Sequence, residues 1–287
     1  MMNNQHKDEL GWTEIIRPDS RFGFYAIKSV WQYRDLLWML VRRDFVANYK
    51  QTILGPIWFF IQPIFTTLIF TVVFGNIAGI STDGLPMMLF YLSGTVLWNY
   101  FAECFSRNAT VFRDNASLFG KVYFPRVIVP LSIIVSNLVK LSIQLALFFA
   151  FWLYFKATGV PLTIGLNILL LPILILLLAI MGLGAGLIIT SFTTKYRDLV
   201  FLITFGIQLL MYATPVIFPL SAVPVKYRVW VELNPLSAII ECFRFITTHS
   251  SSFEYSQLLY SALVSLVMLF LGVWLFAKTE KNFMDTV

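Results

Sequence analysis

Charged residues are scarce in this sequence, and their distribution is uneven. Asp, Glu, Lys and Arg make up 13% of the 287 residues, whereas 58% of the residues are hydrophobic. Soluble domains carry roughly 25% charged residues. The charge-free stretches cover residues 51–82, 84–102, 157–194, 199–225 and 255–277. An ordinary soluble domain is therefore excluded, because about 20 apolar residues suffice to cross a bilayer core of roughly 30 Å.

Catalytic and metal-binding signals are also missing. The two histidines, His6 and His249, have no Cys or carboxylate neighbours at metal-ligand spacing. Cys104 and Cys242 fall on opposite sides of the expected membrane, which argues against a disulfide. Neither the phosphate-binding pattern G-x-x-x-x-G-K-Ser/Thr nor the elbow G-x-S-x-G occurs. We expect no catalytic residue, metal or cofactor on this chain, so ATP hydrolysis would need another chain.

A cleavable signal peptide is not expected either. The first 50 residues are rich in charge and contain no short apolar run that ends in small residues. The net charge of +6 would suggest nucleic acid in a soluble protein, but here the basic bias of membrane-protein loops explains it better. A nucleic-acid partner is not expected.

What remains predicts an all-α integral membrane protein with six transmembrane helices. A tail at 1–28 is followed by an amphipathic helix at 29–52 and a transmembrane domain at 53–278. The expected spans are 54–78, 87–108, 127–155, 165–192, 199–218 and 255–277. A tail at 279–287 ends the sequence. No internal repeat of the kind common in secondary transporters is found.

Basic residues orient this layout. Six spans put both termini on one face, where the sequence places sixteen Lys and Arg residues, against four on the opposite face and Lys140 within a span. The positive-inside rule therefore predicts cytoplasmic termini, with the loops at 109–126 and around 195–198 also in the cytoplasm.

The helix at 29–52 has one apolar face and one basic face. Val30, Tyr33, Leu37, Leu40, Val41 and Phe45 recur at spacings of three and four. Basic residues occupy much of the remaining surface, so the helix is suited to lie along lipid headgroups. Gly55-Pro56 then separates it from the first span, because proline disfavours a helical conformation in the residue before it.

Two polar loops on the cytoplasmic side allow two interpretations. The loop at 109–126 has a short amphipathic helix with an aromatic and basic end, and Lys195-Tyr196-Arg197-Asp198 is a smaller version. Each is either a connector at the membrane surface or a docking helix for a cytoplasmic partner. On the other side, the segment 219–254 is too long for a simple connection, and we interpret it as short helices that re-enter the outer leaflet.

Aromatic residues are abundant in the spans, where sugar rings could stack on them. The candidates for lining a channel are Phe59, Phe60, Trp98, Tyr100, Phe101, Phe205 and Tyr212. Aromatics also fill lipid-facing surfaces and interfacial belts, so the alternative is that these residues face lipid and line no channel.

Of the charges within spans, Glu103 and Arg107 form an i,i+4 pair. Lys140 has no identified partner, because Glu103 lies some 12 Å shallower at 1.5 Å per residue.

Taken in order, these motifs resemble the membrane subunit of polysaccharide ABC exporters, which export O-antigen, capsule and teichoic-acid chains. The matching residues are Arg43-Asp44, Tyr49 to Gly55, Trp58 and Pro63, then Asn115, Leu118, Lys121-Val122, Phe124-Pro125 and Pro130, then Arg197-Asp198, Thr214-Pro215-Val216 and Asn234-Pro235. Their order and spacing agree over residues of about 30–280, whereas the first 28 residues are less characteristic.

The resemblance implies a homodimer in the bacterial cytoplasmic (inner) membrane with a channel at its interface. It also implies two copies of a separate Walker-A ATPase that binds ATP and Mg. Residues that would contact the ATPase are Asn115, Leu118, Lys121, Tyr123, Phe124, Pro125, Arg197 and Asp198. Residues of an outer gate would be Pro215, Pro219, Asn234 and Pro235. The substrate would be a lipid-linked polysaccharide, and we hypothesise that Arg42, Arg43 and Lys50 attract its pyrophosphate.

Three other functions compete with this one. A type-2 ABC exporter for drugs or small lipids shares the fold and the partner requirement. A membrane-embedded acyl- or glycosyltransferase would need a catalytic His or carboxylate cluster, which the sequence lacks. An ion-coupled carrier has only Lys140 and Glu103 in its favour.

Overall fold

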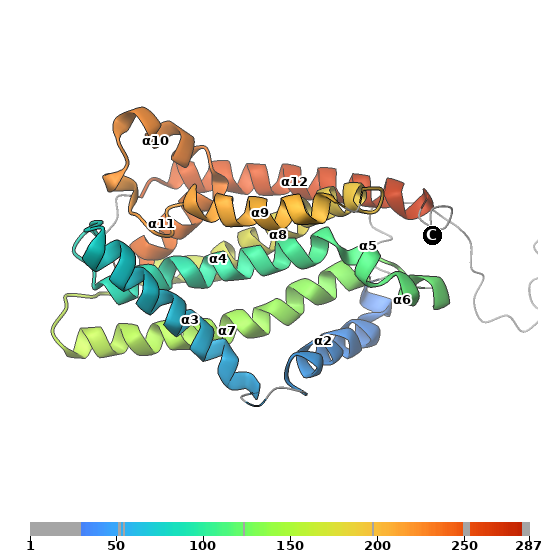
Figure 1. The fold of residues 1–287 in the computed structure, drawn as a ribbon, viewed down its shortest axis with the longest axis horizontal. Coiled ribbons are helices and arrows are strands. Elements are labelled where there is room, and N and C mark those ends of the chain that lie inside the picture. Colours follow the sequence, from blue (N-terminus) through green and yellow to red (C-terminus); the bar gives the residue numbers. More distant parts are fainter. Residues whose placement is uncertain are drawn as a thin grey trace, which may run out of the picture.

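The computed structural model describes residues 30–50, 53, 55–122, 124–196, 198–248 and 253–282, and all regular structure in these residues is helical. Four long helices run along the long axis of the molecule: α4 (Met87–Ala109), α7 (Ile128–Ala157), α8 (Leu171–Thr193) and α12 (Tyr255–Asn282) (Figure 1). The shorter α9 (Leu199–Tyr212) follows the same direction, and α3 (Trp58–Phe70) crosses α4 and α7 obliquely.

Four stretches of the described chain are long and apolar enough to cross a membrane. They are Trp58–Ile77, Ile128–Ala157, Leu166–Thr193 and Tyr255–Glu280. The prediction of an all-α protein with membrane-spanning helices is thereby confirmed for these residues. The remaining expected spans differ in kind: α4 has the length but carries many polar residues, and α9 has only 14 residues, about 21 Å at 1.5 Å per residue.

Helix bounds follow the expected spans closely, with one exception. The stretch expected at 199–218 is helical only to Tyr212, where the chain turns through Thr214-Pro215. Proline disfavours a helical conformation in the residue before it and has no N–H to continue the ladder, which explains the early end. The first span also changes character, since α3 continues as a π-helix over Thr71–Ile77.

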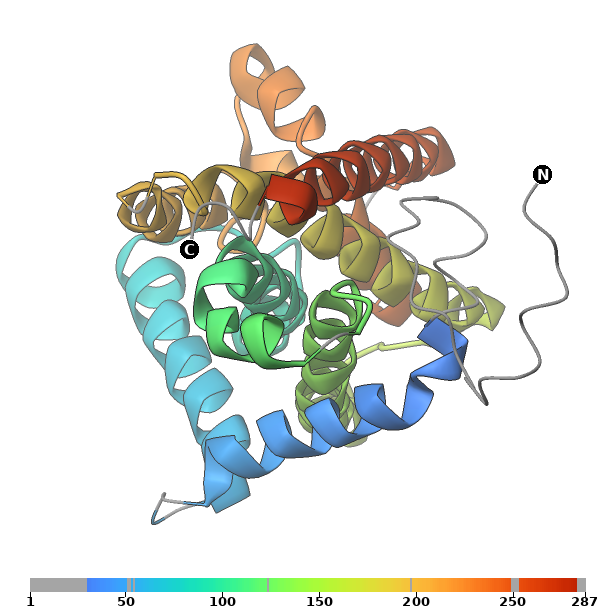
Figure 2. The ribbon, with the colours of Figure 1, turned by 90° about the vertical axis from the view of Figure 1, so that its right-hand side faces the viewer.

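The helix α2 (Arg34–Tyr49) lies across one end of the bundle rather than along it (Figure 2). After it, the chain turns through a single 3-10 turn at Gly55–Ile57 into α3. Gly55 has a φ of 51°, a left-handed conformation that glycine adopts without the steric cost of a side chain. The break predicted at Gly55-Pro56 is therefore present. The predicted tail at 1–28 and the last five residues lie outside the described part of the chain.

The centre of the bundle is α4. Fifteen of its 23 residues are buried, among them Ser93, Thr95 and Asn108. By contrast, α3 buries only Pro63 and Thr67, and α9 buries none of its residues. Both α3 and α9 lie on the same side of the bundle (Figure 2). One face of the protomer is therefore formed by two helices with little protein around them.

Short helices gather at opposite ends of the bundle. At one end lie α5 (Val111–Asp114) and α6 (Ala116–Lys121), near the C-terminal end of α12 (Figure 1). At the other end lie α10 (Val225–Glu232) and α11 (Pro235–Thr248). This arrangement agrees with the expectation that the loop at 109–126 and the segment 219–254 face opposite sides of the membrane.

Candidate functional site

The turn between α4 and α7 is built on an aromatic cluster. Phe112, Phe119 and Phe124 are all buried, and the ring centroid of Phe112 lies 4.6 Å from that of Phe276 in a stacked arrangement. Arg126 joins the turn to α12, because its Nη1 donates to the main-chain oxygen of Glu280 at 3.0 Å. The loop at 109–126 is thus a folded part of the bundle, held against the last helix, and not a loose connector.

The other members of the predicted ATPase-contact set differ in exposure. Lys121 and Val122 are exposed, and Val122 keeps 54% of its surface although it is apolar. Asn115, Leu118 and Pro125 are partly buried, and the side-chain amide of Asn115 donates to the main-chain oxygen of Val111 at 3.0 Å. Asp198 is exposed at the start of α9. Tyr123 and Arg197 lie outside the described residues.

The amphipathic helix α2 is attached to α4 through a buried carboxylate. Asp44 is only 7% exposed and accepts hydrogen bonds from Arg107 Nη2 at 2.8 Å and from Arg43 Nη2 at 2.9 Å. Leu40 and Val41 are buried beside it. Of the predicted pyrophosphate residues, Arg42 and Lys50 are exposed and have no ion pair among the described residues, whereas Arg43 is held by Asp44.

A second ion pair corrects two interpretations of the sequence. Arg107 bonds to Asp44 and not to Glu103, so the expected Glu103–Arg107 pair on one helix face is wrong. Glu103 instead lies 3.6 Å from Lys140 Nζ, a pairing that the estimated depths made doubtful. The depth estimate failed because the two helices are staggered. The N-terminal end of α7 extends beyond the C-terminal end of α4 (Figure 1).

The predicted channel residues divide into two groups. Phe60, Phe205 and Tyr212 are exposed, and Phe59 is partly buried, all on α3 and α9. Trp98, Tyr100 and Phe101 are at most 5% exposed within the core around α4. Side chains that the protomer already encloses offer no surface to a channel in this conformation, so the argument for a channel wall rests on α3 and α9.

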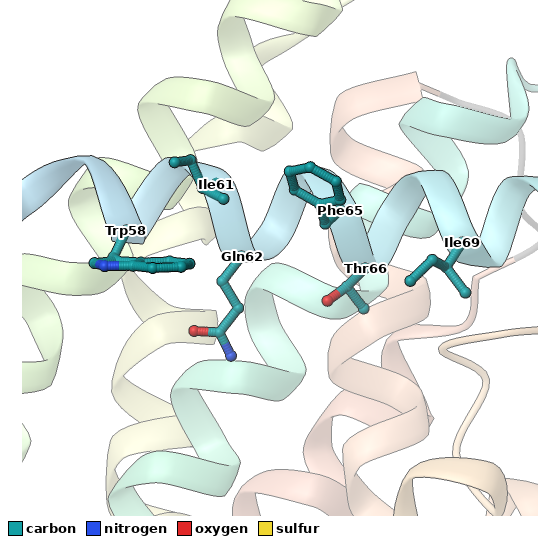
Figure 3. A pocket seen from close by; sticks show the side chains of 6 residues that line it. All are labelled: Trp58, Ile61, Gln62, Phe65, Thr66 and Ile69. Atoms are coloured by element: carbon teal, nitrogen blue, oxygen red, sulfur yellow. The ribbon is translucent and has the colours of Figure 1, made fainter. Parts of the chain in front are cut away.

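A groove follows the outward face of α3. It is lined by Trp58, Ile61, Gln62, Phe65, Thr66 and Ile69. Figure 3 shows Gln62 and Thr66 projecting from the same side of the helix, one turn apart, among apolar neighbours. The face therefore offers two polar side chains on an otherwise apolar and aromatic surface.

At the opposite end, the predicted gate residues are brought together. Asn234 Nδ2 donates to Thr214 Oγ1 at 2.8 Å, and Asn234 Oδ1 accepts from the main-chain N–H of Leu236 at 3.1 Å. This one side chain joins the turn after α9 to the first turn of α11, which begins at Pro235. Pro215 and Pro219 are buried close by in sequence. The two motifs, 20 residues apart in the chain, form one corner.

The strongest polar feature of this end was not singled out from the sequence. Arg244 of α11 is 1% exposed, and its Nη1 donates to Glu241 Oε1 at 3.0 Å. Its Nη2 donates to the main-chain oxygen of Val216 at 3.1 Å, its Nε donates to Ser93 Oγ at 3.2 Å, and its Cζ lies 3.7 Å from the ring centroid of Phe90. The available signal was the i,i+3 spacing of Glu241 and Arg244 in an apolar helix.

Close packing makes this arrangement specific. A Cβ on Gly94 would lie 2.9 Å from the main-chain oxygen of Val216 and 3.0 Å from Arg244 Nη2. Trp152 Nε1 of α7 donates to the main-chain oxygen of Thr247 at 2.7 Å, which attaches α11 from a second side. Helix α11 is therefore fixed to α4 and α7. In contrast, no residue of α10 is buried.

The described residues contain no group of three or more His, Cys, Asp and Glu side chains placed to hold a metal ion. Cys104 and Cys242 are both free and buried. The structure has three notable parts. They are the folded surface of α5 and α6 at one end, the fixed corner of α11 at the other end, and the loosely covered face of α3 and α9 between them.

Similarity to known proteins shows which class of membrane transporter this is. A family model described as "ABC-2 type transporter" matches residues 35–248, and the chain belongs to this family. Among curated proteins, the chain is 24% identical over 263 residues to "O-antigen export system permease protein RfbA" of Myxococcus xanthus, covering 91% of this chain and 98% of that protein. It is also 24% identical over 250 residues to "Polysialic acid transport protein KpsM" of Escherichia coli, covering 84% and 92%.

A third relative extends the same group. The chain is 22% identical over 267 residues to "Capsule polysaccharide export inner-membrane protein CtrC" of Neisseria meningitidis, covering 89% of this chain and 95% of that protein. The similarity thus runs over nearly the whole length of each protein. This chain is a multi-pass membrane protein of the same family.

The fixed corner gives a first prediction. We expect Arg244→Met to destabilise the protein by about 3–5 kcal/mol, because Glu241 would stay buried without its counter-charge. The variant Arg228→Met removes the partly exposed ion pair with Glu232 and should cost less than about 1 kcal/mol. Both effects are measured as the loss of the monodisperse size-exclusion peak after heating the detergent-solubilised protein.

The double variant Glu241→Gln/Arg244→Met serves as a further control. It removes both charges and should recover part of the stability lost in Arg244→Met. Equal thermal stability of Arg244→Met and Arg228→Met would show that the buried pair does not hold α11.

Proposed function

We propose that this chain is the channel-forming permease of an ATP-driven exporter, and that it moves a lipid-linked polysaccharide across the bacterial cytoplasmic membrane. The observation that carries this proposal is the similarity over nearly the full chain to relatives whose names describe O-antigen and capsule export. The same names favour a polysaccharide over a drug or small lipid as substrate. The ordered motifs around Gly55, Lys121 and Pro215 point the same way.

The topology in this proposal has six spans with both termini in the cytoplasm. The four apolar stretches are joined by α4 and α9. Polar residues in α4 are compatible with a span because Ser93, Thr95 and Asn108 are enclosed by other helices and Glu103 is paired with Lys140. The distribution of basic residues, sixteen to four, supports a cytoplasmic position for α5 and α6 and an outer position for α10 and α11.

The partner that hydrolyses ATP is a separate subunit in this proposal. Two ATPase copies with bound ATP and Mg would contact the surface of α5 and α6 below a dimer of this chain. The aromatic cluster supports this role, because a docking element must be rigid to transmit force. When ATP closes the ATPase pair, α6 would shift and the spans of the two protomers would part.

The homodimer would place its channel at the face formed by α3 and α9. This face supports the proposal because its large apolar side chains are exposed in the protomer. Phe65 keeps 60% of its surface, Phe205 57% and Tyr212 56%. Apolar surface of this extent on a membrane protein faces lipid or another subunit. A glycan would slide along aromatic rings and the few polar groups of the groove in Figure 3.

The basic surface of α2 is the proposed site of first contact with the pyrophosphate of the lipid carrier. Arg42 and Lys50 are exposed, and their charges are available to an anion. Arg43 has a structural role as well, since it pairs with Asp44. The structure thus gives different surroundings to Arg42 and Arg43, although the sequence analysis assigned both the same role.

Export itself is tested by deleting the gene in its native bacterium. We expect surface polysaccharide to be lost and lipid-linked glycan to accumulate on the cytoplasmic face, because synthesis would continue without transport. The glycan is measured by lipid extraction and by labelling of intact cells, with the wild-type gene returned as control. Unchanged surface glycan in the deletion strain would contradict the proposal.

The docking surface is tested by comparing an exposed residue with a buried one. Val122→Asp should uncouple ATP hydrolysis from export at normal protein yield, because Val122 is 54% exposed next to α6. Phe124→Ala should instead lower the yield of folded protein, with a loss of about 3–5 kcal/mol for an emptied aromatic site. ATPase rate, export and yield are measured on the assembled complex. Full coupling in Val122→Asp would count against this surface.

The pyrophosphate contact is tested by charge reversal of Arg42. We expect Arg42→Glu to reduce export by at least about fivefold without loss of complex assembly, since one basic residue near an anionic surface contributes about 1 kcal/mol. Lys226→Glu, an exposed charge at the opposite end of the bundle, should leave export unchanged. Equal export by the two variants would contradict the proposed role of Arg42.

A further inference from the structure

Helix α3 is held weakly along most of its length. Only Pro63 and Thr67 are buried in α3, and Gly75 is buried in the π-helix that follows. Pro63 lacks an N–H and removes one hydrogen bond of the helix ladder, and the π-helix at Thr71–Ile77 changes the ladder again. Breaks of both kinds allow a helix to bend. A helix with few buried side chains and two breaks can move relative to the bundle.

One polar contact attaches the first turn of this helix to its neighbours. Lys140 Nζ lies 5.7 Å from the ring centroid of Phe59 and 3.6 Å from Glu103 Oε2. The side chain of Lys140 is 19% exposed, and that of Glu103 is 52% exposed. An ammonium group over an aromatic ring gains most when it is shielded from water, as this one largely is. Three helices, α3, α4 and α7, therefore meet at one lysine.

Polar side chains surround this lysine on α4 and α7. A small pocket there, of about 20 Å³, is lined by Asn99, Tyr100, Glu103, Asn137, Lys140, Leu141 and Gln144. The volume is enough for about one water molecule and far too small for a sugar or a phosphate group. The pocket is therefore not a substrate site. It provides polar neighbours for the ammonium group in a region of apolar helices.

The topology gives this contact its significance. Helices α4 and α7 are the two arms of one hairpin, whose turn is α5 and α6. Glu103 stands on the first arm and Lys140 on the second. A force on α5 and α6 that shifts one arm against the other changes the separation of these two charges. Lys140 must then move relative to Phe59 or carry Phe59 with it.

We propose that Lys140 is a positioning residue that transmits movement of the α4–α7 hairpin to α3, through its ion pair with Glu103 and its contact with the ring of Phe59. This inference rests on the proposed function, because the force comes from the ATPase partner. It assigns Lys140 no contact with the glycan. The lysine determines where the first turn of α3 lies, and thereby the position of the groove in Figure 3.

The experiment follows α3 directly in the assembled complex with its ATPase subunits. Ile57→Cys carries an environment-sensitive fluorophore, since Ile57 is 53% exposed, lies two residues before Phe59, and both native cysteines are buried. ATP should shift the emission of the labelled wild type. In Lys140→Met we expect the rate of ATP hydrolysis to stay within about twofold of the wild-type rate. The emission shift should disappear, and export should fall at least about tenfold, which corresponds to 1.4 kcal/mol.

Two variants separate the ring contact from the ion pair. Lys140→Arg keeps a cation able to pair with Glu103 and to lie over a ring, so it should retain most of the shift. Phe59→Leu keeps the ion pair and removes the ring, and it should behave like Lys140→Met. The matched control is Lys156→Met, at the far end of the same helix, where Nζ lies 4.9 Å from the ring of Trp152. This control should keep both shift and export.

Each result decides the proposal. A normal emission shift and normal export in Lys140→Met would overturn it, as would a wild-type complex whose label does not respond to ATP. Loss of complex assembly in both Lys140→Met and Lys140→Arg would overturn it in favour of a purely structural lysine. If the emission shifts of the variants follow the expected pattern but the wild type exports no glycan, the transmission role stands and the proposed substrate is wrong.

Discussion

The structure depends on keeping a polar helix away from lipid. Helix α4 carries the buried polar residues Ser93, Thr95 and Asn108, and a polar group exposed to hydrocarbon costs several kcal/mol. The other helices therefore surround it, and hydroxyls such as that of Thr95 bond to main-chain oxygens of its own helix. This enclosure explains why 15 of the 23 residues of α4 are buried although α4 is not among the four stretches that are apolar enough to cross a membrane.

The same enclosure makes α4 the element to which both ends of the bundle are attached. Asp44 binds Arg107 near one end of α4, and Arg244 binds Ser93 and lies over Phe90 near the other. Both attachments contain a buried charge, Asp44 in one and Arg244 in the other, so they are costly to break once formed. The amphipathic helix and the outer corner thus move with α4. The covered side of the molecule behaves as one body, and α3 and α9 lie outside it.

Local chemistry made much of this predictable from the sequence. Charge-free stretches, turn residues and Gly55-Pro56 gave helix bounds that agree closely, and the two motifs at Thr214 and Asn234 do meet in space. The failures concern contacts between helices. The stagger of α4 and α7 decides that Glu103 meets Lys140, and the position of α2 decides that Arg107 meets Asp44. No residue pattern encodes either arrangement. Burial of Trp98, Tyr100 and Phe101 likewise depends on which helix occupies the centre.

The division between a fixed body and two loosely covered helices suits the transport of a long polymer. A wall that binds each sugar tightly would stop the chain, so successive sites must be weak and alike. The outward face of α3 meets this condition, because Trp58 and Phe65 offer ring surface while Gln62 and Thr66 offer single hydrogen bonds. A wall that changes width must also move without unfolding the body. Helices that bury almost nothing can do so, since their displacement breaks few contacts, whereas displacing α4 or α11 would separate buried charges.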